Sequence, residues 1–569
     1  MADRRSATLP KSLKRRSLLQ CAVGLASGAA AAMLPLGSTC AQRRRDEVPE
    51  VGQPAAKSRG RLESPNYRPP VVEVQAGKLR GFRDGRTLTF LGIPYAEAER
   101  FQLPKPATSW AGIKSAQAWG PVCPIPNATG PGGDEFVFPH RYWLQNEHCQ
   151  VLNVWTQSTS RTALKPVMVW FHGGGFVNGS SMEAHAYTGK NLSEYGEVVV
   201  VSMNHRLNVI GCLDLSAYGP DYANSRYTGA ADMVAALQWV RDNIETFGGD
   251  PGNVTIFGQS AGGGEVARML HTPAAKGLFH RVIAQSGGGQ DYEATDPAEM
   301  IRMQQMIAAA TLENLSLRGD QIERLRAISY PQLLAAGEAA LTTVAQTLGR
   351  GRLGWGVIAD DRYILRKLCD WAGSMPLMAG STFSESSGTL DKGTGKNDWT
   401  GKEIGDRLTA AYGKKKDEVV AGFSKAFPRK RVQDVLYYSA DSRVPVKALL
   451  TRKLAVSQAP AYTYIFAYEY PVNGGITAFH CSEIAFVFHN LTVPEVEVAT
   501  GGAPAGLALQ DRVSQAWINF ARTGNPSQDG LEWKPFRAAD PQTMVFDVVS
   551  ECRTLHDEKL SSLMSDKDA

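Results

Sequence analysis

Apolar and polar positions divide most of the chain into strand-like and helix-like segments in alternation. Short apolar runs rich in β-branched residues are typical of strands, and they occur in PVMVWFHGGG (166–175), EVVVVSMNHRL (197–207), NVTIFGQS (253–260) and HRVIAQSGG (280–288). Between the second and third runs, residues 229–247 have the apolar spacing of a helix. This alternation predicts a mostly parallel sheet with helices on both faces.

The pattern differs on either side of this central region. Short hairpin-like strands come first, in VVEVQAGKLRGF (71–82) and TLTFLGIPYA (87–96). Residues 290–350 are rich in helical spacing and predict a helical insertion that caps the sheet. No internal repeat or linker-like break interrupts the chain after about Tyr67, so residues 67–569 are predicted to form one α/β domain.

The N-terminal segment predicts an export signal followed by a linker. A pair of arginines precedes an Ala/Gly-rich apolar run that ends in small residues. This order predicts a twin-arginine-type signal peptide over residues 1–41, cleaved after Ala41. The polar, proline-rich residues 42–66 predict a flexible linker. The protein is therefore expected in the periplasm or secreted, without stable membrane association after cleavage.

Two alternatives for this leader stay open. A membrane anchor is disfavoured by the Ala/Gly content and by Pro35, which make a weak membrane span. Lipid attachment at Cys40 is disfavoured because Gly37 stands where a large aliphatic residue is expected.

The net charge of +5 comes from 61 basic and 56 acidic side chains. Residues 1–41 hold six of the bases and one acid, so the remainder balances at 55 of each. A neutral remainder has no net field to attract phosphate backbones, which argues against a nucleic-acid partner. The hydrophobic content of 43% is typical of a globular domain.

Six cysteines remain after the predicted cleavage: Cys123, Cys149, Cys212, Cys369, Cys481 and Cys552. In an oxidising compartment, Cys123 and Cys149 are near enough in sequence to close a small loop, and the pairing of the other four stays open. No CxxC pair or Cys/His cluster has the spacing of a zinc site, so no zinc site is expected.

The segment IFGQSAGGGE (256–265) places Ser260 between glycines at the end of a strand-like run. A strand, a tight turn and a helix in succession form a nucleophile elbow, which exposes one hydroxyl at a helix N-terminus. Gly258 and Gly262 would then be required, because side chains there would collide with the neighbouring strand and helix. A plain glycine turn is the alternative until partners for the serine are found.

A second glycine-rich loop, FHGGGF (171–176), follows another predicted strand. Its unobstructed N–H groups can point at a developing oxyanion, together with the amide of Ala261. The alternatives are a plain loop and a phosphate cradle. No lysine follows in P-loop spacing, which disfavours the cradle.

A serine nucleophile needs a histidine base that lies late in the chain when the order is Ser, acid, His. The late histidines are His480, His489 and His556. His480 is favoured because glycines lead into it and an amphipathic helical pattern follows. A structural role for His480 is the alternative.

The orienting acid should follow a strand between the serine and the histidine. Residues 376–379 predict such a strand, with Gly380 as a turn and Glu385 after it. Asp391 is a nearby competitor, and the residues alone leave the choice open.

Several segments together resemble the type-B carboxylesterase/cholinesterase family, in its bacterial form. They are HGGGF, NHRL, ALQWVRDNIETFGGDPGNVTIFGQSAGG, QSGG, AFHCSEIAFVF and AWINFARTGNPSQDGLEWKPF. The resemblance runs from Tyr67 to about Asp547, with the motifs in the family's order. It implies an α/β-hydrolase fold: a large, mixed, mostly parallel sheet flanked by helices, with helical cap insertions.

The resemblance also implies roles for individual residues. It makes Ser260 the nucleophile, Glu385 the acid and His480 the base of a Ser-His-Glu triad. The remaining implied roles are oxyanion donors at Gly174, Gly175 and Ala261, a supporting serine at Ser286, and a disulfide between Cys123 and Cys149.

Two departures from the family pattern bear on function or structure. Gln259 stands where the family usually has glutamate, which argues against cationic choline esters as substrates. His148 stands where an acid is usual, so a local ion pair is expected to be absent.

The sequence therefore predicts an exported serine carboxylesterase that hydrolyses small-molecule esters through an acyl-enzyme. Hydrolysis by an activated serine requires neither a metal nor an organic cofactor. Amide, carbamate or lactone hydrolysis with the same triad, an interfacial lipase, and a non-catalytic cholinesterase-like binding protein are the alternatives. The physiological ester and the oligomeric state stay open. Trp143, Trp355 and Tyr292 are equally compatible with a pocket lining and with core packing.

Overall fold

The computed structural model describes residues 68–126, 143–288, 291–386, 395–456, 459–472, 474–555 and 557–565. By internal contacts the chain divides into the units Met1–Leu62 and Glu63–Ala569, and the description below concerns the second. The predicted signal peptide and linker lie outside the described residues, as do the competing candidates Asp391 and His556.

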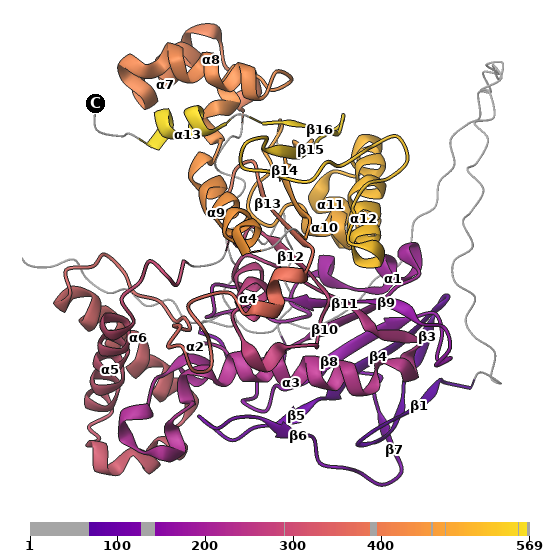
Figure 1. The fold of residues 1–569 in the computed structure, drawn as a ribbon, viewed down its shortest axis with the longest axis vertical. Coiled ribbons are helices and arrows are strands. Elements are labelled where there is room, and N and C mark those ends of the chain that lie inside the picture. The colour runs from indigo at the N-terminus through magenta and orange to yellow at the C-terminus, as the bar shows by residue number, and fades with distance from the viewer. Residues whose placement is uncertain are drawn as a thin grey trace, which may run out of the picture. The chain divides into compact units, whose positions relative to one another are not determined.

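An eleven-stranded mixed sheet runs through the domain (Figure 1). In spatial order its strands are β16 (Glu551–Thr554), β15 (Gln542–Phe546), β14 (Ala461–Phe466), β13 (Leu377–Thr382), β12 (Arg281–Gln285), β11 (Gly249–Gln259), β9 (Lys165–Phe171), β10 (Val199–Met203), β8 (Val151–Thr156), β4 (Thr87–Pro94) and β3 (Phe82–Asp84). Pairing is parallel from β15 to β10 and antiparallel at both ends. This confirms the predicted mixed, mostly parallel sheet.

Two small sheets use the remaining strands, which come from the N-terminal part of the described chain. One joins β1 (Val71–Val74), β2 (Gly77–Arg80) and β7 (Ile113–Ser115), and the other joins β5 (Ala96–Glu97) and β6 (Lys105–Pro106). The short early strands were predicted from the hairpin-like pattern.

Helices cover both faces of the large sheet. They are α1 (Lys190–Gly196), α2 (Asn208–Cys212), α3 (Thr228–Asn243), α4 (Ala261–Met269), α5 (Pro297–Asn314), α6 (Tyr330–Thr347), α7 (Gly401–Tyr412), α8 (Lys416–Ala426), α9 (Ala440–Val456), α10 (Ile484–Val487), α11 (Pro494–Thr500), α12 (Pro504–Thr523) and α13 (Glu558–Ser565). None of the helices in the described ranges is long and apolar enough to cross a membrane.

The sheet separates two buried apolar clusters because successive strand residues point to opposite faces. In β9, Val167 and Val169 join the cluster that includes α3 residues such as Leu237. Met168 and Trp170 join the other, which includes residues of α12. Both faces of β9 are therefore buried, as its continuous apolar run predicts.

The predicted helical insertion is present as α5 and α6, which pack side by side (Figure 1). Helix α6 also contacts α2, which ties the insertion to the segment after β10. A second pair, α7 and α8, lies against the C-terminal helix α13 through α8.

One local prediction, a turn at Gly380, is wrong. Strand β13 continues to Thr382, so Gly380 lies within it. A Cβ at Gly380 would lie 2.2 Å from the ring of Tyr464 on the neighbouring strand. The glycine makes room for this aromatic ring, a requirement that its sequence neighbourhood does not reveal.

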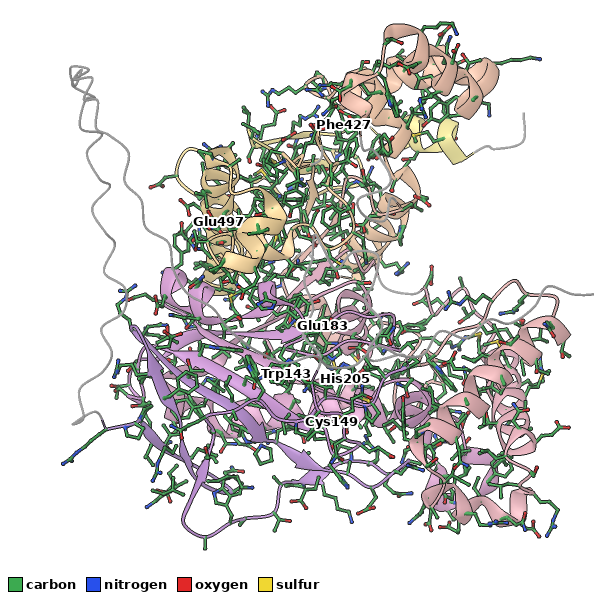
Figure 2. All side chains as sticks on the ribbon, turned by 180° about the vertical axis from the view of Figure 1, so that it is seen from behind. Trp143, Cys149, Glu183, His205, Phe427 and Glu497 are labelled. Carbon is green, nitrogen blue, oxygen red and sulfur yellow. The ribbon has the colours of Figure 1, made fainter. Side chains whose placement is uncertain are left out.

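The disulfide implied between Cys123 and Cys149 is not formed in the structure, where both are buried free thiols. The two side chains are neighbours: burial and then the Cys123 thiol raise the pKa of Cys149 well above its ordinary value. Cys149 is labelled in Figure 2.

The ion pair expected to be missing near His148 is present. Its acid is the preceding residue, Glu147, which accepts a 2.7 Å hydrogen bond from Nε of Arg100 and pairs with a second guanidinium nitrogen. The neighbourhood of His148 therefore does contain an ion pair, formed by Glu147 and Arg100.

Candidate active site

Ser260 lies at a sharp corner between β11 and α4. Its backbone angles are φ 58° and ψ −124°, a conformation that non-glycine residues rarely adopt. A Cβ on Gly258 would lie 2.6 Å from the backbone of Gly262, and one on Gly262 would lie 2.1 Å from the carbonyl oxygen of Phe171. The predicted strand–turn–helix corner and its need for these glycines are confirmed.

His480 lies in the loop before α10 and faces the serine. Its Nε2 is 2.9 Å from Ser260 Oγ, and its Nδ1 is hydrogen-bonded to Oε2 of Glu385. A carboxylate only accepts hydrogen bonds, so the proton sits on Nδ1 and leaves Nε2 free to accept from the hydroxyl. Glu385 is held in turn by the backbone N–H of Thr382, at 2.7 Å.

The pKa shifts along this row of hydrogen bonds favour an ionised Glu385 and a basic His480. Burial would raise the pKa of Glu385, but hydrogen bonding and the charge of His480, with the Ser286 hydroxyl and the Thr382 amide, hold it below its ordinary value. Burial would lower the pKa of His480, but neighbouring Cys481 and Glu385 raise it well above its ordinary value.

The second glycine loop lies beside the serine. Gly174 and Gly175 have φ of 106° and 65°, in the region that favours glycine. A Cβ on Gly173 would lie 3.2 Å from Ser260 Cβ, so this backbone touches the corner. Ala261 begins α4, where the first N–H groups of a helix lack internal partners. The oxyanion roles of Gly174, Gly175 and Ala261 stay predictions, and the loop and the start of α4 both adjoin Ser260.

Two further predicted residues lie next to the triad. Ser286 follows β12 with φ 50°, and its hydroxyl is among the groups that lower the pKa of Glu385. Gln259 is only 1% exposed, its amide nitrogen lies 3.4 Å from Nε2 of His480, and its oxygen accepts a 3.2 Å hydrogen bond from the Cys481 thiol. The structure therefore brings all the residues proposed around Ser260 together.

Sequence reasoning missed a second buried carboxyl, Glu483, three residues after His480. Burial and then the charge of Glu385 raise the pKa of Glu483 to about 7. Gln285 donates a 3.2 Å hydrogen bond to it and accepts one from Trp517. The only sequence signal was an acid in the helical turn after the candidate base.

The three aromatic residues left open are now placed. Trp355 is buried and donates to Glu338 at 2.7 Å, and Tyr292 is buried with its hydroxyl 3.0 Å from Nε of Arg268. Both belong to a core cluster. Trp143 (labelled in Figure 2) is 37% exposed. Within the described ranges, no group of three His, Cys, Asp or Glu residues could hold a metal ion.

Residues 68–561 match the model of the carboxylesterase family. The chain belongs to this family. It is 31% identical over 487 residues to the para-nitrobenzyl esterase of Bacillus subtilis, a match that covers 84% of this chain and 94% of that protein. The phenmedipham hydrolase of Pseudarthrobacter oxydans is 30% identical, with the same coverage of both chains.

Solved carboxylesterase-family structures have the same fold. An esterase of Clostridium hathewayi that can hydrolyse aliphatic aromatic polyesters is 40% identical, with a TM-score of 0.80, and the match covers 87% of this chain and 97% of that one. A thermophilic para-nitrobenzyl esterase gives a TM-score of 0.68 at 29% identity. The α/β-hydrolase fold predicted from the resemblance is confirmed, and the protein is a carboxylic ester hydrolase.

Proposed function

We propose that the protein is a serine carboxylesterase that works through an acyl-enzyme. The observation that supports it most is the chain of hydrogen bonds from Ser260 through His480 to Glu385, at a corner that exposes the serine hydroxyl. Such a chain lets an imidazole remove the hydroxyl proton as the oxygen attacks a carbonyl.

In the first half-reaction Ser260 Oγ attacks the ester carbonyl carbon while Nε2 of His480 takes the hydroxyl proton. The carbonyl oxygen becomes an oxyanion, which accepts hydrogen bonds from the amides of Gly174, Gly175 and Ala261. Collapse breaks the bond to the alcohol oxygen, and His480 returns its proton to the departing alcohol.

In the second half-reaction a water molecule attacks the acyl-enzyme while His480 takes its proton. Collapse of this second intermediate releases the carboxylic acid, and His480 returns the proton to Ser260. Glu385 holds the proton on Nδ1 throughout and stabilises the imidazolium that forms twice in each cycle.

Carbamate hydrolysis is a second candidate, because the phenmedipham hydrolase is as similar to this chain as several esterases are. The same nucleophile, base and oxyanion loop serve amides and lactones as well. A non-catalytic binding role is opposed by the presence of all three triad side chains in hydrogen-bonded order. A panel of esters, carbamates and aliphatic aromatic polyesters, compared by kcat/KM, ranks these substrates.

Titration with an organophosphate tests the mechanism. We expect a covalent adduct on Ser260, one per chain, in step with the loss of ester turnover. Ser260→Ala should fold, form no adduct and lose turnover by at least about a thousandfold. Absence of an adduct in the wild-type protein, or retained turnover in the variant, would exclude Ser260 as the nucleophile.

We also propose that the protein is exported, to the periplasm or the medium, with residues 1–41 removed. Support comes from the arginine pair and the apolar run of the leader. An N-terminus at Gln42 in protein recovered from the periplasm or the medium would agree. Retention of the full chain in the cytoplasm would contradict it.

A further inference from the structure

Two stacked histidines and a carboxylate are buried behind the oxyanion loop, outside the triad. His172 directly precedes Gly173, His205 follows β10, and Glu265 lies on α4; they are 2%, 1% and 3% exposed. The two imidazole rings lie 4.8 Å apart, 15° from parallel. Figure 2 labels His205 inside the domain.

His172 is bound to the backbone of the loop itself. Its Nδ1 lies 2.9 Å from the carbonyl oxygen of Gly173, which only accepts, so the ring carries its proton on Nδ1. Burial, followed by the charge of His205, lowers the pKa of His172 to about 3, so the ring is neutral. A Cβ on Gly179 would lie 2.3 Å from that oxygen and 2.7 Å from that nitrogen. Gly179 therefore leaves room for this hydrogen bond.

The carbonyl that His172 holds belongs to the same peptide unit as the amide of Gly174. In a trans peptide the C=O and the N–H point to opposite sides of the chain. A hydrogen bond that holds the Gly173 carbonyl therefore fixes the direction of the Gly174 N–H. Because Gly173 also lies against Ser260, a rotation of this unit would move an amide away from the reacting carbonyl.

His205 is an imidazolium held by a carboxylate. Its Nε2 lies 3.3 Å from Oε2 of Glu265, and its Nδ1 lies 3.2 Å from the carbonyl oxygen of Arg206. Nδ1 thus has a hydrogen-bond acceptor, and Nε2 lies within ion-pair distance of a carboxylate. Burial opposes the charge, but Glu265 and the Arg206 carbonyl raise the pKa of His205 to about 9.

Two further charged groups lie near this pair. Burial would raise the pKa of Glu265, but the charge of His205 and also the positive charge of Arg268 lower it. Asp232, on α3, is paired with Arg206 at 2.7 Å, and Arg268, on α4 beside Glu265, holds the hydroxyl of Tyr292. The stacked imidazolium thus presents a fixed, charged face to the neutral ring of His172. This arrangement disfavours a second proton on His172 and limits tilting of its ring.

We propose that His172, supported by the His205–Glu265 ion pair, is a positioning residue that aims the Gly174 amide at the oxyanion. The inference rests on the proposed serine mechanism. None of the three side chains touches reacting atoms. Their effect should therefore fall on kcat and on transition-state analogues, with little effect on KM.

The test compares His172→Phe with His172→Asn, each normalised to the sites that an organophosphate labels. Phenylalanine keeps the stacking but has no donor, so we expect kcat to fall about tenfold or more with KM nearly unchanged. Affinity for a trifluoromethyl ketone, whose adduct carries an oxyanion, should fall by the same factor. Asparagine places an N–H near the position of Nδ1 and should recover most of both losses.

Two further variants separate positioning from folding. Glu265→Gln should lower kcat per labelled site by a few-fold, because it removes the charge that supports His205. Asp434→Asn breaks a buried pair with Lys396, 2.8 Å away, and should lower Tm while leaving kcat per site and ketone affinity unchanged.

If His172→Phe kept the wild-type kcat per labelled site and the wild-type affinity for the ketone, the inference would be overturned. If that variant does not fold, the same two values unchanged in Glu265→Gln would overturn it instead. Failure of the wild-type protein to label at Ser260 would overturn the proposed mechanism, and the inference with it. These outcomes are distinct because labelling is measured before any variant is compared.

Discussion

His480 can accept the proton of Ser260 only while its Nε2 is unprotonated, so its pKa sets the acidic limit of turnover. Burial would lower that pKa, but Cys481 and Glu385 raise it well above 6.5. Turnover should therefore rise with pH through a midpoint above 6.5. In Glu385→Gln one cause of the raised pKa is lost, so the midpoint in kcat/KM should move to lower pH and kcat should fall about ten-thousandfold.

The measurement is the pH profile of kcat/KM with a neutral ester. Asp391→Asn is the matched control, because the sequence alone left Asp391 as the competing acid; it should keep the wild-type midpoint and kcat. A midpoint that moves in Asp391→Asn and stays in place in Glu385→Gln would reverse the assignment.

Gln259 contacts the candidate base His480, although it is adjacent in sequence to the candidate nucleophile Ser260. It is buried, and its amide contacts His480 and Cys481. We expect Gln259→Glu to raise the pKa of His480 further, since a carboxylate would replace a neutral amide beside the ring. The acidic midpoint of kcat/KM should move to higher pH.

The same Gln259→Glu variant tests substrate charge. If the missing carboxylate disfavours cations, the ratio of kcat/KM for a choline ester to that for its neutral isostere should rise in the variant. An unchanged ratio would show that Gln259 influences the base alone.

Close packing between elements makes the corner at Ser260 sensitive to single methyl groups. In Gly262→Ala the new Cβ would meet the backbone oxygens of Phe171 and His172 at 2.1 and 2.6 Å. Backbone atoms cannot rotate away, so β9 and α4 would have to separate. We expect a loss of at least about 2 kcal/mol in the free energy of unfolding, with loss of turnover.

Gly264→Ala is the matched control for Gly262→Ala, because both positions lie in α4. The nearest atom to a Cβ there is Cζ of Phe176 at 3.8 Å, an ordinary contact. Alanine favours a helix over glycine by up to about 1 kcal/mol, so Tm should stay or rise. Equal Tm values for the two variants, measured by thermal unfolding, would refute the close contact.

Local signals explain which elements were predictable. The apolar runs of β9, β11 and β12 and the glycines around Ser260 identify strands and corner within a few residues of sequence. Gly380 was misassigned because its partner Tyr464 is distant in the chain. A glycine signals a need for space without saying whether a turn or a ring requires it.

The candidate site divides in the same way. Ser260 and His480 have informative flanking residues, whereas Glu385 could be preferred to Asp391 only through the family resemblance. His172 and His205 lie in the motifs HGGGF and NHRL, but nothing in these motifs indicates that they meet Glu265, because the three residues come from separate parts of the chain and meet only in the fold. Prediction from sequence ends where a role depends on such long-range contacts.

Across the whole molecule, some buried histidines have raised pKa values and others have lowered ones. Together they should make the folded state most stable near neutral pH. Glu265 and the Arg206 carbonyl outweigh burial and raise the pKa of His205 to about 9. The stability that protonated His205 contributes is fully present below the unfolded pKa of about 6.5 and is lost as pH rises through 9. Over that span it amounts to roughly 3 kcal/mol in the free energy of unfolding. Glu265→Gln should flatten the decline in Tm between pH 6.5 and pH 9.5.

His172 and His271 limit stability on the acidic side. Burial lowers their pKa values, to about 3 and about 4, so both are neutral in the folded state. The unfolded chain binds these protons near pH 6.5, so stability is complete above that pH and falls as pH approaches the folded values, by roughly 3 kcal/mol for each histidine at pH 4.

His271 provides the cleaner test because it lies outside the oxyanion loop. Its Nδ1 is 3.1 Å from the carbonyl oxygen of Leu365, and asparagine can supply a non-titrating donor there. Urea unfolding of His271→Asn should lose less stability between pH 7 and pH 4.5 than wild type does; equal losses would mean that this imidazole is already protonated in the folded protein.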